Sequence, residues 1–244
     1  MNDALPPYSY SDPNVLAFVA IPIALVLALA LGMAVSSWRV GERVFATRRA
    51  VAVLVGGAAW MAVWWYTAST GVLRLWDATP PPFASLVGGV VAASLLIAFG
   101  SYGRRLAAGI PLWILIAVQG FRLPLEVAMH SMYEAGIMPE QMTYTGQNFD
   151  IVTGATALIV APIVRTGRAR GLAIVWNALG FGLLVNIVVI AILSTPRFQY
   201  FGPDQLNTFV TYPPFVLLPA VMVVAALAGH LLIVRALLMR PASR

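Results

Sequence analysis

Long runs of apolar residues, separated by short polar segments, are the dominant pattern along this chain. A helix that crosses a bilayer needs about 20 mostly apolar residues, and several segments meet that requirement. They cover residues 15–38, 50–73, 84–102, 108–136, 150–166, 171–194 and 214–238. These runs are too long, and alternate too little, to be strands of a transmembrane barrel. The sequence therefore predicts an all-α, polytopic membrane protein in which residues 1–244 form a single domain of seven transmembrane helices.

Arginines and acidic residues are distributed unequally over the connections between these segments. Arginines gather in alternate connections and after the last segment, at Arg39, Arg43, Arg48, Arg49, Arg104, Arg105, Arg165, Arg168, Arg170, Arg235, Arg240 and Arg244. The other connections hold only Arg74 and Arg197, together with Asp3, Asp12, Asp77, Glu134, Glu140, Asp150 and Asp204. Because cytoplasmic loops carry an excess of basic residues, we expect the N-terminus outside and the C-terminus in the cytoplasm.

The composition excludes several classes of protein. With 60% hydrophobic and 10% charged residues, the chain is far from a soluble domain, in which about 25% of the residues are charged. The absence of cysteine excludes thiol chemistry and cysteine-ligated metal centres. All 15 basic residues are arginine, which excludes a retinal Schiff base and other lysine-dependent mechanisms.

The basic character of the chain has an explanation that does not involve nucleic acid. The isoelectric point is near 10.2, but the arginines lie where they would meet anionic lipid headgroups. We therefore expect the lipid bilayer as a partner and no nucleic acid.

The fourth segment carries polar side chains that helix packing does not require. They are separated by 3, 4, 4, 3 and 1 residues, so at about 100° per residue they share one face of a helix. The set consists of Gln119, Arg122, Glu126, His130, Tyr133 and Glu134. An arginine at the bilayer centre costs about 2.5–3.5 kcal/mol on insertion scales, so we expect this stripe to face the protein interior or a hydrated cavity.

Two interpretations of the stripe follow. In the functional one, Arg122 holds an anion or pairs with Glu126 four residues later, while Glu126 and His130 exchange protons in a pocket open to the outside. In the structural one, the same residues form a network that only fixes helix packing. Ionisable residues inside a membrane mark functional sites by default, which favours the functional interpretation.

Polar residues outside the fourth segment are candidates to complete the site. Asp150 suits the first turn of the next helix, or it folds over the stripe with Asn148 as a lid. In the sixth segment, Asn177 and Asn186 are nine residues apart and so lie on opposite faces. At most one of them addresses the cavity, and Asn186 is the predicted one because it lies nearer the membrane centre. The aromatic-rich connection 195–213 is expected to form an ordered cover.

Metal and haem sites are not favoured by the sequence. His130 and His230 differ by roughly 18 Å in expected depth, too far to ligate one haem iron. Glu126 and His130, joined by Asp150, have ligand spacing for zinc but no third histidine nearby. Thioethers that suit Cu(I) lie at the same end, at Met129, Met132, Met138 and Met142, but Met132 points away from the His130 face. We expect no cofactor and no resident metal.

Part of the chain resembles a known family. The residues are Phe121-Arg122-x-Pro124-x-Glu126, followed by Pro139-x-x-Met142-Thr143-x-x-Gly146-x-Asn148-Phe149-Asp150. This pattern, together with further matches between residues 113 and 238, resembles a family of uncharacterised bacterial integral membrane proteins with seven helices. The resemblance implies a bacterial membrane protein and carries no known activity.

The sequence thus favours a multi-pass protein of the bacterial inner membrane that handles a small solute or ion, as a transporter or channel-like protein rather than an enzyme. The predicted site comprises Gln119, Arg122, Glu126, His130, Glu134, Asn148, Asp150 and Asn186. One alternative is a receptor or a subunit of a membrane complex, whose site binds a ligand or lipid, or packs against a partner protein or a second copy. A further alternative is an intramembrane metal hydrolase.

Overall fold

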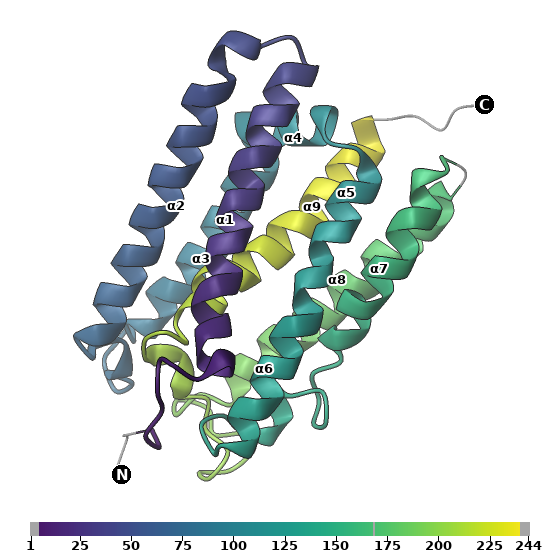
Figure 1. Cartoon of the computed structure of the whole chain (residues 1–244). Helices are drawn as coiled ribbons and strands as arrows, with labels where there is room; N and C mark the ends of the chain where they lie inside the picture. Colours follow the sequence, from purple (N-terminus) through teal and green to yellow (C-terminus); the bar gives the residue numbers. More distant parts are fainter. Residues whose placement is uncertain (1–4, 168, 240–244) are drawn as a thin grey trace.

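The structure is a computed structural model that describes residues 5–167 and 169–239. It is 75% helical, and the described residues contain no strand. The α-helices are α1 (Pro13–Arg39), α2 (Ala46–Ser69), α3 (Phe83–Phe99), α4 (Ser101–Gly109), α5 (Leu112–Val118), α6 (Arg122–Glu134), α7 (Asp150–Arg165), α8 (Arg170–Leu193) and α9 (Val224–Met239). Figure 1 shows most of these helices running lengthwise through an elongated bundle, with α4 lying across one end.

Several helices are long and apolar enough to cross a membrane. Five segments qualify among the described residues: Pro13–Arg39, Arg43–Ser69, Leu112–Glu134, Arg170–Leu193 and Leu218–Met239. A sixth is obtained if α3 and α4, which are bent by 54° relative to each other, form one broken span. Helix α7 has 16 residues, fewer than the about 20 that a spanning helix needs. The structure therefore shows five or six candidate spans, where the sequence predicts seven.

The connection after the third predicted span differs from the expectation. The sequence places that span at 84–102 and leaves the following residues as a loop, whereas α3 ends at Phe99 and α4 begins two residues later. A Cβ atom at Gly109 would lie 2.6 Å from the Ser36 Cα atom, so the absence of a side chain lets α4 pack directly on α1. Because α4 occupies residues expected in the loop, the fourth lengthwise segment begins at Leu112 instead of residue 108.

The fourth lengthwise segment is interrupted near its centre. A 3-10 turn, Gln119–Phe121, separates α5 from α6, and Pro124 follows it without an N–H group to donate to the Gly120 carbonyl. A Cβ atom at Gly154 would lie 2.6 Å from the Leu123 backbone nitrogen, so α6 and α7 cross at very short range. This close crossing brings the start of α6 beside the start of α7.

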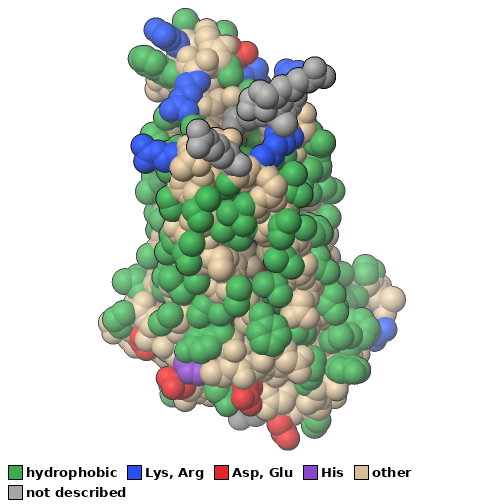
Figure 2. All heavy atoms as spheres, turned by 90° about the vertical axis from the view of Figure 1, so that its right-hand side faces the viewer, with side chains coloured by type: hydrophobic (Ala, Val, Ile, Leu, Met, Phe, Trp, Pro, Cys, Tyr) green, Lys and Arg blue, Asp and Glu red, His purple; other side chains and the backbone are tan. Residues whose placement is uncertain are grey.

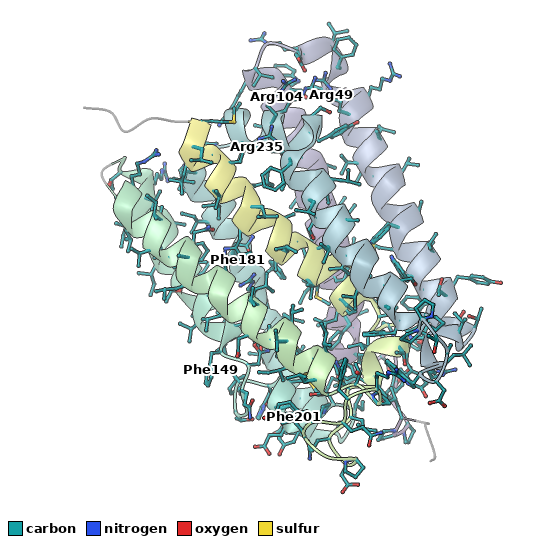
Figure 3. All side chains as sticks on the ribbon, turned by 180° about the vertical axis from the view of Figure 1, so that it is seen from behind. Arg49, Arg104, Phe149, Phe181, Phe201 and Arg235 are labelled. Atoms are coloured by element: carbon teal, nitrogen blue, oxygen red, sulfur yellow. The ribbon has the colours of Figure 1, made fainter. Side chains whose placement is uncertain are left out.

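The outer surface is apolar around the middle of the bundle. Figure 2 shows hydrophobic side chains over this zone, arginines at one end and acidic side chains with a histidine at the other. Exposed members of the belt include Leu31, Val55, Ile159 and Leu179. Apolar surface of this extent is expected to face lipid. Figure 3 places Arg49, Arg104 and Arg235 at the arginine-rich end and Phe149 and Phe201 at the other.

Asp3, Arg168, Arg240 and Arg244 lie outside the described residues. Some of the remaining arginines of that end, among them Arg39 and Arg235, donate to carbonyl oxygens near the ends of helices. Arg235 donates from Nη1 to the carbonyl oxygens of Ala98 and Gly100, at 2.7 and 3.1 Å, where the α3 carbonyls have no further helical partners.

An ion-pair cluster at the arginine-rich end joins the α1–α2 connection to α4. Arg105 Nε donates to Glu42 Oε2 at 2.7 Å, and Arg49 contacts the same carboxylate. The hydrogen bond from Arg105 holds the pKa of Glu42 below its ordinary value of 4.5. A carboxylate with a lowered folded-state pKa stabilises the fold above its unfolded-state pKa, and loses that contribution as pH falls through the folded-state value.

We therefore expect Glu42→Gln to lower the Tm of the detergent-solubilised protein at pH 7 and to have little effect once the pH falls well below 4.5. The measurement is a series of thermal unfolding curves over this pH interval. Glu140→Gln, at an exposed position on the opposite end, is the control. Equal changes in Tm for the two variants at every pH would contradict the stabilising role of the Glu42 cluster.

Candidate functional site

The centre of the polar stripe is a buried ion pair between α6 and α7. Arg122, the first residue of α6, donates from Nη1 to Oδ1 of Asp150, the first residue of α7, at 2.7 Å. Arg122 is only 1% exposed and Asp150 is also buried. From the sequence, Arg122 was expected either to hold an anion or to pair with Glu126 along one helix. The structure pairs Arg122 with Asp150 instead, because the close helix crossing places the Asp150 carboxylate in contact with the guanidinium.

Asn148 joins the second carboxylate to this pair. Its Nδ2 group donates to both Glu126 oxygens at 2.8 Å and to the Met142 carbonyl oxygen at 3.0 Å. Its Oδ1 atom accepts from the Asp150 backbone N–H at 3.1 Å, which satisfies one of the free donors at the start of α7. Asn148 and Asp150 are therefore part of the buried cluster, and Asp150 lies in the first turn of α7, as expected from the sequence.

The guanidinium of Arg122 is only partly satisfied. Its Nε and Nη2 atoms have no hydrogen-bond partner among the residues that the structure describes. These two nitrogens lie on one edge of the planar group, and such an edge binds a carboxylate or another oxyanion through two parallel hydrogen bonds. The arrangement thus keeps a bidentate anion-binding edge free while Nη1 is held by Asp150.

A cavity adjoins this cluster. It has a volume of about 110 Å³, and its lining includes Arg122, Glu126, Asn148 and Asp150. The other walls are mainly apolar and come from α3, α6, α8 and the segment that leads into α9, including Phe83, Val87, Leu125, Met129, Leu184, Ile187, Leu218 and Met222. An engineered cavity of roughly 150 Å³ holds benzene, so this space suits a small organic molecule or a few waters.

A second buried polar group lies next to the ion pair and was not selected from the sequence. His230 of α9 and Asn177 of α8 are both buried, and their Nδ1 and Oδ1 atoms are 2.9 Å apart. A Cβ atom at Gly180 would lie 2.8 Å from the His230 ring and 2.7 Å from Thr153 Cγ2, so this glycine lets the three elements meet. Thr153 lies three residues after Asp150 and so shares its helix face. This spacing is the feature of the sequence from which Thr153 could have been predicted to lie near the site.

The outer part of the stripe separates from this cluster. His130 is half-buried at the acidic end of the bundle, 3.6 Å from Glu134 through Nε2 and Oε1, and its ring packs on Tyr144. Glu134 is mostly exposed. Gln119 lies on the other side: it is buried and lines a different, larger cavity. Only Arg122 and Glu126 of the stripe therefore line the smaller cavity.

Asn186 also differs from the expectation. It is exposed, and its Nδ2 group donates to the Gln147 carbonyl oxygen at 2.9 Å. The two asparagines of α8 do lie on opposite faces, but packing against α9 turns the Asn177 face inward. Membrane depth was the wrong criterion for choosing between them, because the direction of the side chain decides which one reaches the interior.

The segment between α8 and α9 covers the cavity at the acidic end. Asn207 Nδ2 donates to the Ala191 carbonyl oxygen at 3.0 Å, and Gln141 Nε2 donates to Ser194 Oγ and to the Gln205 carbonyl oxygen at 2.9 and 2.8 Å. Asn207 and Val210 line the cavity. These bonds hold the connection in place, as its aromatic composition led us to expect.

Metal ligands are not gathered in the described part of the chain. No group of three or more His, Cys, Asp or Glu residues there could hold a metal ion. Of the methionines weighed as copper ligands, Met129, Met132, Met138 and Met142 all pack in an apolar core cluster.

No known protein family, curated protein or solved structure matches this chain. The geometry and charge of the buried cluster are therefore the basis for assigning a function.

The Arg122–Asp150 pair should show strong energetic coupling. Removing one partner of a buried ion pair costs about 3–5 kcal/mol, because the other charge stays buried without compensation. We expect Arg122→Met and Asp150→Leu each to lower the free energy of unfolding by about this amount, and the double variant to lose clearly less than the sum.

The measurement is a double-mutant cycle of reversible unfolding in mixed micelles. Arg197→Gln, at an exposed site, is the control and should change the free energy by less than about 0.5 kcal/mol. Strictly additive losses in the double variant would show that the two side chains do not stabilise each other.

Proposed function

We propose that this chain is a multi-pass protein of the bacterial inner membrane with seven crossings, its N-terminus outside and its C-terminus in the cytoplasm. Two of the seven proposed crossings, those of α3 and α7, are not regular spanning helices. Helix α3 crosses the membrane and then bends into α4 at the arginine-rich end, so that the two helices together form one broken span. Helix α7 extends about 24 Å at 1.5 Å per residue, and its polar first turn is buried in protein, so it needs no lipid contact there. The bacterial origin rests on the family resemblance.

The chain contains no cysteine, so single cysteines report orientation directly. Val44 is 90% exposed at the arginine-rich end and Tyr200 is 72% exposed at the acidic end. In intact cells, a membrane-impermeant maleimide should label Tyr200→Cys at once and Val44→Cys only after lysis. The unmodified chain is the control, and labelling in the reverse order would overturn the orientation.

We further propose that the cavity beside Arg122 binds a small organic anion, and that the protein moves it together with a proton. The free Nε–Nη2 edge of Arg122 is the observation that carries this proposal. Apolar walls opposite the charged cluster favour a solute with a short hydrocarbon part, such as a carboxylate of a few carbon atoms.

The charges beside the cavity are the reason to expect that anion binding is coupled to the binding of a proton. Asp150 already neutralises Arg122, and Glu126 adds a further carboxylate in the same low-dielectric space. An anion entering this space would meet net repulsion unless Glu126 carries a proton. Anion binding and protonation of Glu126 therefore favour each other, with His130 and Glu134 at the acidic end of the same helix as the proposed route for proton exchange.

Butyrate is a suitable probe because it remains ionised at the pH values of interest. In nanodiscs, the wild-type protein should bind butyrate more tightly as the pH is lowered, whereas Glu126→Gln, which is always neutral, should bind it with little pH dependence. Isothermal titration calorimetry gives the affinities. Methyl butyrate, which has the same acyl chain but neither a charge nor a hydrogen-bond donor, is the matched control ligand.

Butyrate affinity that equals that of methyl butyrate, or that does not change with pH in the wild-type protein, would refute the proposed site. In proteoliposomes, a proton-coupled transporter should carry radiolabelled butyrate faster when a pH gradient is imposed, above the passive rate of protein-free vesicles. Glu126→Gln should remove that acceleration. Binding without such transport would instead indicate a receptor or a subunit of a membrane complex.

A further inference from the structure

A second and larger cavity lies on the other side of α9. Met222 and Ala226 face the cavity beside Arg122, whereas Val224 and Ala228 face the larger one. Residues two apart on a helix differ by about 200°, so the segment entering α9 and α9 itself separate the two spaces. In Figure 1 α9 crosses the bundle obliquely behind α1, and α1, α2 and α5 contribute further walls.

The larger cavity has the size of a ligand pocket and walls made of hydrocarbon. Its volume is about 590 Å³, within the range of roughly 300–1,000 Å³ that is usual for small-molecule sites. Leu25, Leu29, Val53, Leu115 and Leu232 are typical of its lining. Leu31 and Val118 also line it and are 66% and 39% exposed on the outside of the bundle, which gives the cavity a rim on the apolar, lipid-facing surface.

Gln119 is a polar residue on the wall of this cavity, and its side-chain oxygen lacks a hydrogen-bond partner. It is 1% exposed, lines the cavity, and its Oε1 atom has no hydrogen-bond partner within the described part of the protein. Gly229 makes room for the amide, because a Cβ atom there would lie 1.9 Å from Gln119 Nε2. The other polar group on the wall, Trp60 Nε1, already donates to the Ala220 carbonyl oxygen at 2.7 Å.

The chemistry of the walls restricts what can occupy this space. A buried water needs two to four polar partners, so a cavity of this size whose lining has a single side chain with an unsatisfied polar atom, that of Gln119, is poorly suited to hold a cluster of waters. A plain hydrocarbon chain fits the walls but leaves that acceptor unpaired, which is costly in a buried site. An ammonium group would donate, but it would bring a charge into hydrocarbon. A neutral hydroxyl group on an extended hydrocarbon body would donate a hydrogen bond to the Gln119 oxygen, while the hydrocarbon would pack against the apolar walls.

We propose that the larger cavity binds a lipophilic alcohol taken from the bilayer, with its hydroxyl group donating a hydrogen bond to Gln119 Oε1. The hydrocarbon body lies against Leu29, Leu115 and Leu232 and enters past the rim at Leu31 and Val118. This site is separate from the anion site at Arg122.

The test uses 1-dodecanol carrying a diazirine in the middle of its chain, added to the full-length protein in nanodiscs. After illumination, mass spectrometry of peptides should locate the label on the cavity-lining parts of α1, α2, α5 or α9. Unlabelled 1-dodecanol should compete, and its methyl ether, which cannot donate, should compete about tenfold less well.

Two variants separate the hydroxyl contact from the cavity itself. Gln119→Leu should weaken competition by 1-dodecanol about tenfold while leaving competition by the methyl ether unchanged. Gly56→Leu should reduce labelling strongly, because Gly56 lines the cavity and a Cβ atom there meets no atom within 4 Å. Gly182→Leu, with equal free space on α8, is the control and should label like the wild-type protein.

Several outcomes would overturn the proposal. They are labelling spread evenly over the lipid-facing surface, equal competition by the alcohol and its ether, and a Gln119→Leu variant that does not discriminate between them. Equal competition would show that the cavity only holds hydrocarbon chains. Size-exclusion profiles and thermal unfolding curves verify that each variant is folded. Butyrate binding at Arg122 is measured separately, so the two proposals can fail independently.

Discussion

An arginine buried among apolar helices must be neutralised, and this requirement organises the centre of the protein. The Arg122–Asp150 pair meets it by joining the first residues of α6 and α7, and Asn148 then ties Glu126 to the same cluster. A buried ion pair of this kind is weak evidence for stability in itself. It does, however, dictate how the two helices must be placed, since separating them would leave a charge uncompensated in a low-dielectric interior.

Glycines at the helix crossings and irregular helical turns make this placement sterically feasible. Gly154 allows the α6 backbone to approach α7, and Gly180 allows the His230 ring to reach Thr153. Irregular helical turns occur next to two prolines. The 3-10 turn Gln119–Phe121 precedes Pro124, and a π-helical segment, Leu218–Val223, contains Pro219. Both interruptions lie at the level of the cavities, where a regular helix would direct its side chains differently.

The two cavities divide the interior into chemically different spaces. One is lined in part by Arg122, Glu126, Asn148 and Asp150, whereas the lining of the other is almost entirely hydrocarbon, with an unpaired amide oxygen on Gln119. Gln119 and Arg122 are three residues apart, yet they line different cavities, which α9 and the segment entering it separate. A helix face identified by spacing alone therefore does not define one site.

The sequence by itself determined the all-helical class, most of the apolar spans and the asymmetry of charge between the two ends, because these depend on local composition and on the length of hydrophobic runs. It also predicted that Gln119, Arg122 and Glu126 point inward, since helical periodicity and the cost of a charge in lipid suffice for that inference. Only the tertiary structure decided that Arg122 pairs with Asp150, that Asn177 rather than Asn186 faces the interior, and that residues after Gly100 form a helix across the end. Each of these outcomes depends on how closely and at what angle helices distant in sequence pack, and the spacing of residues along one segment carries no information about that.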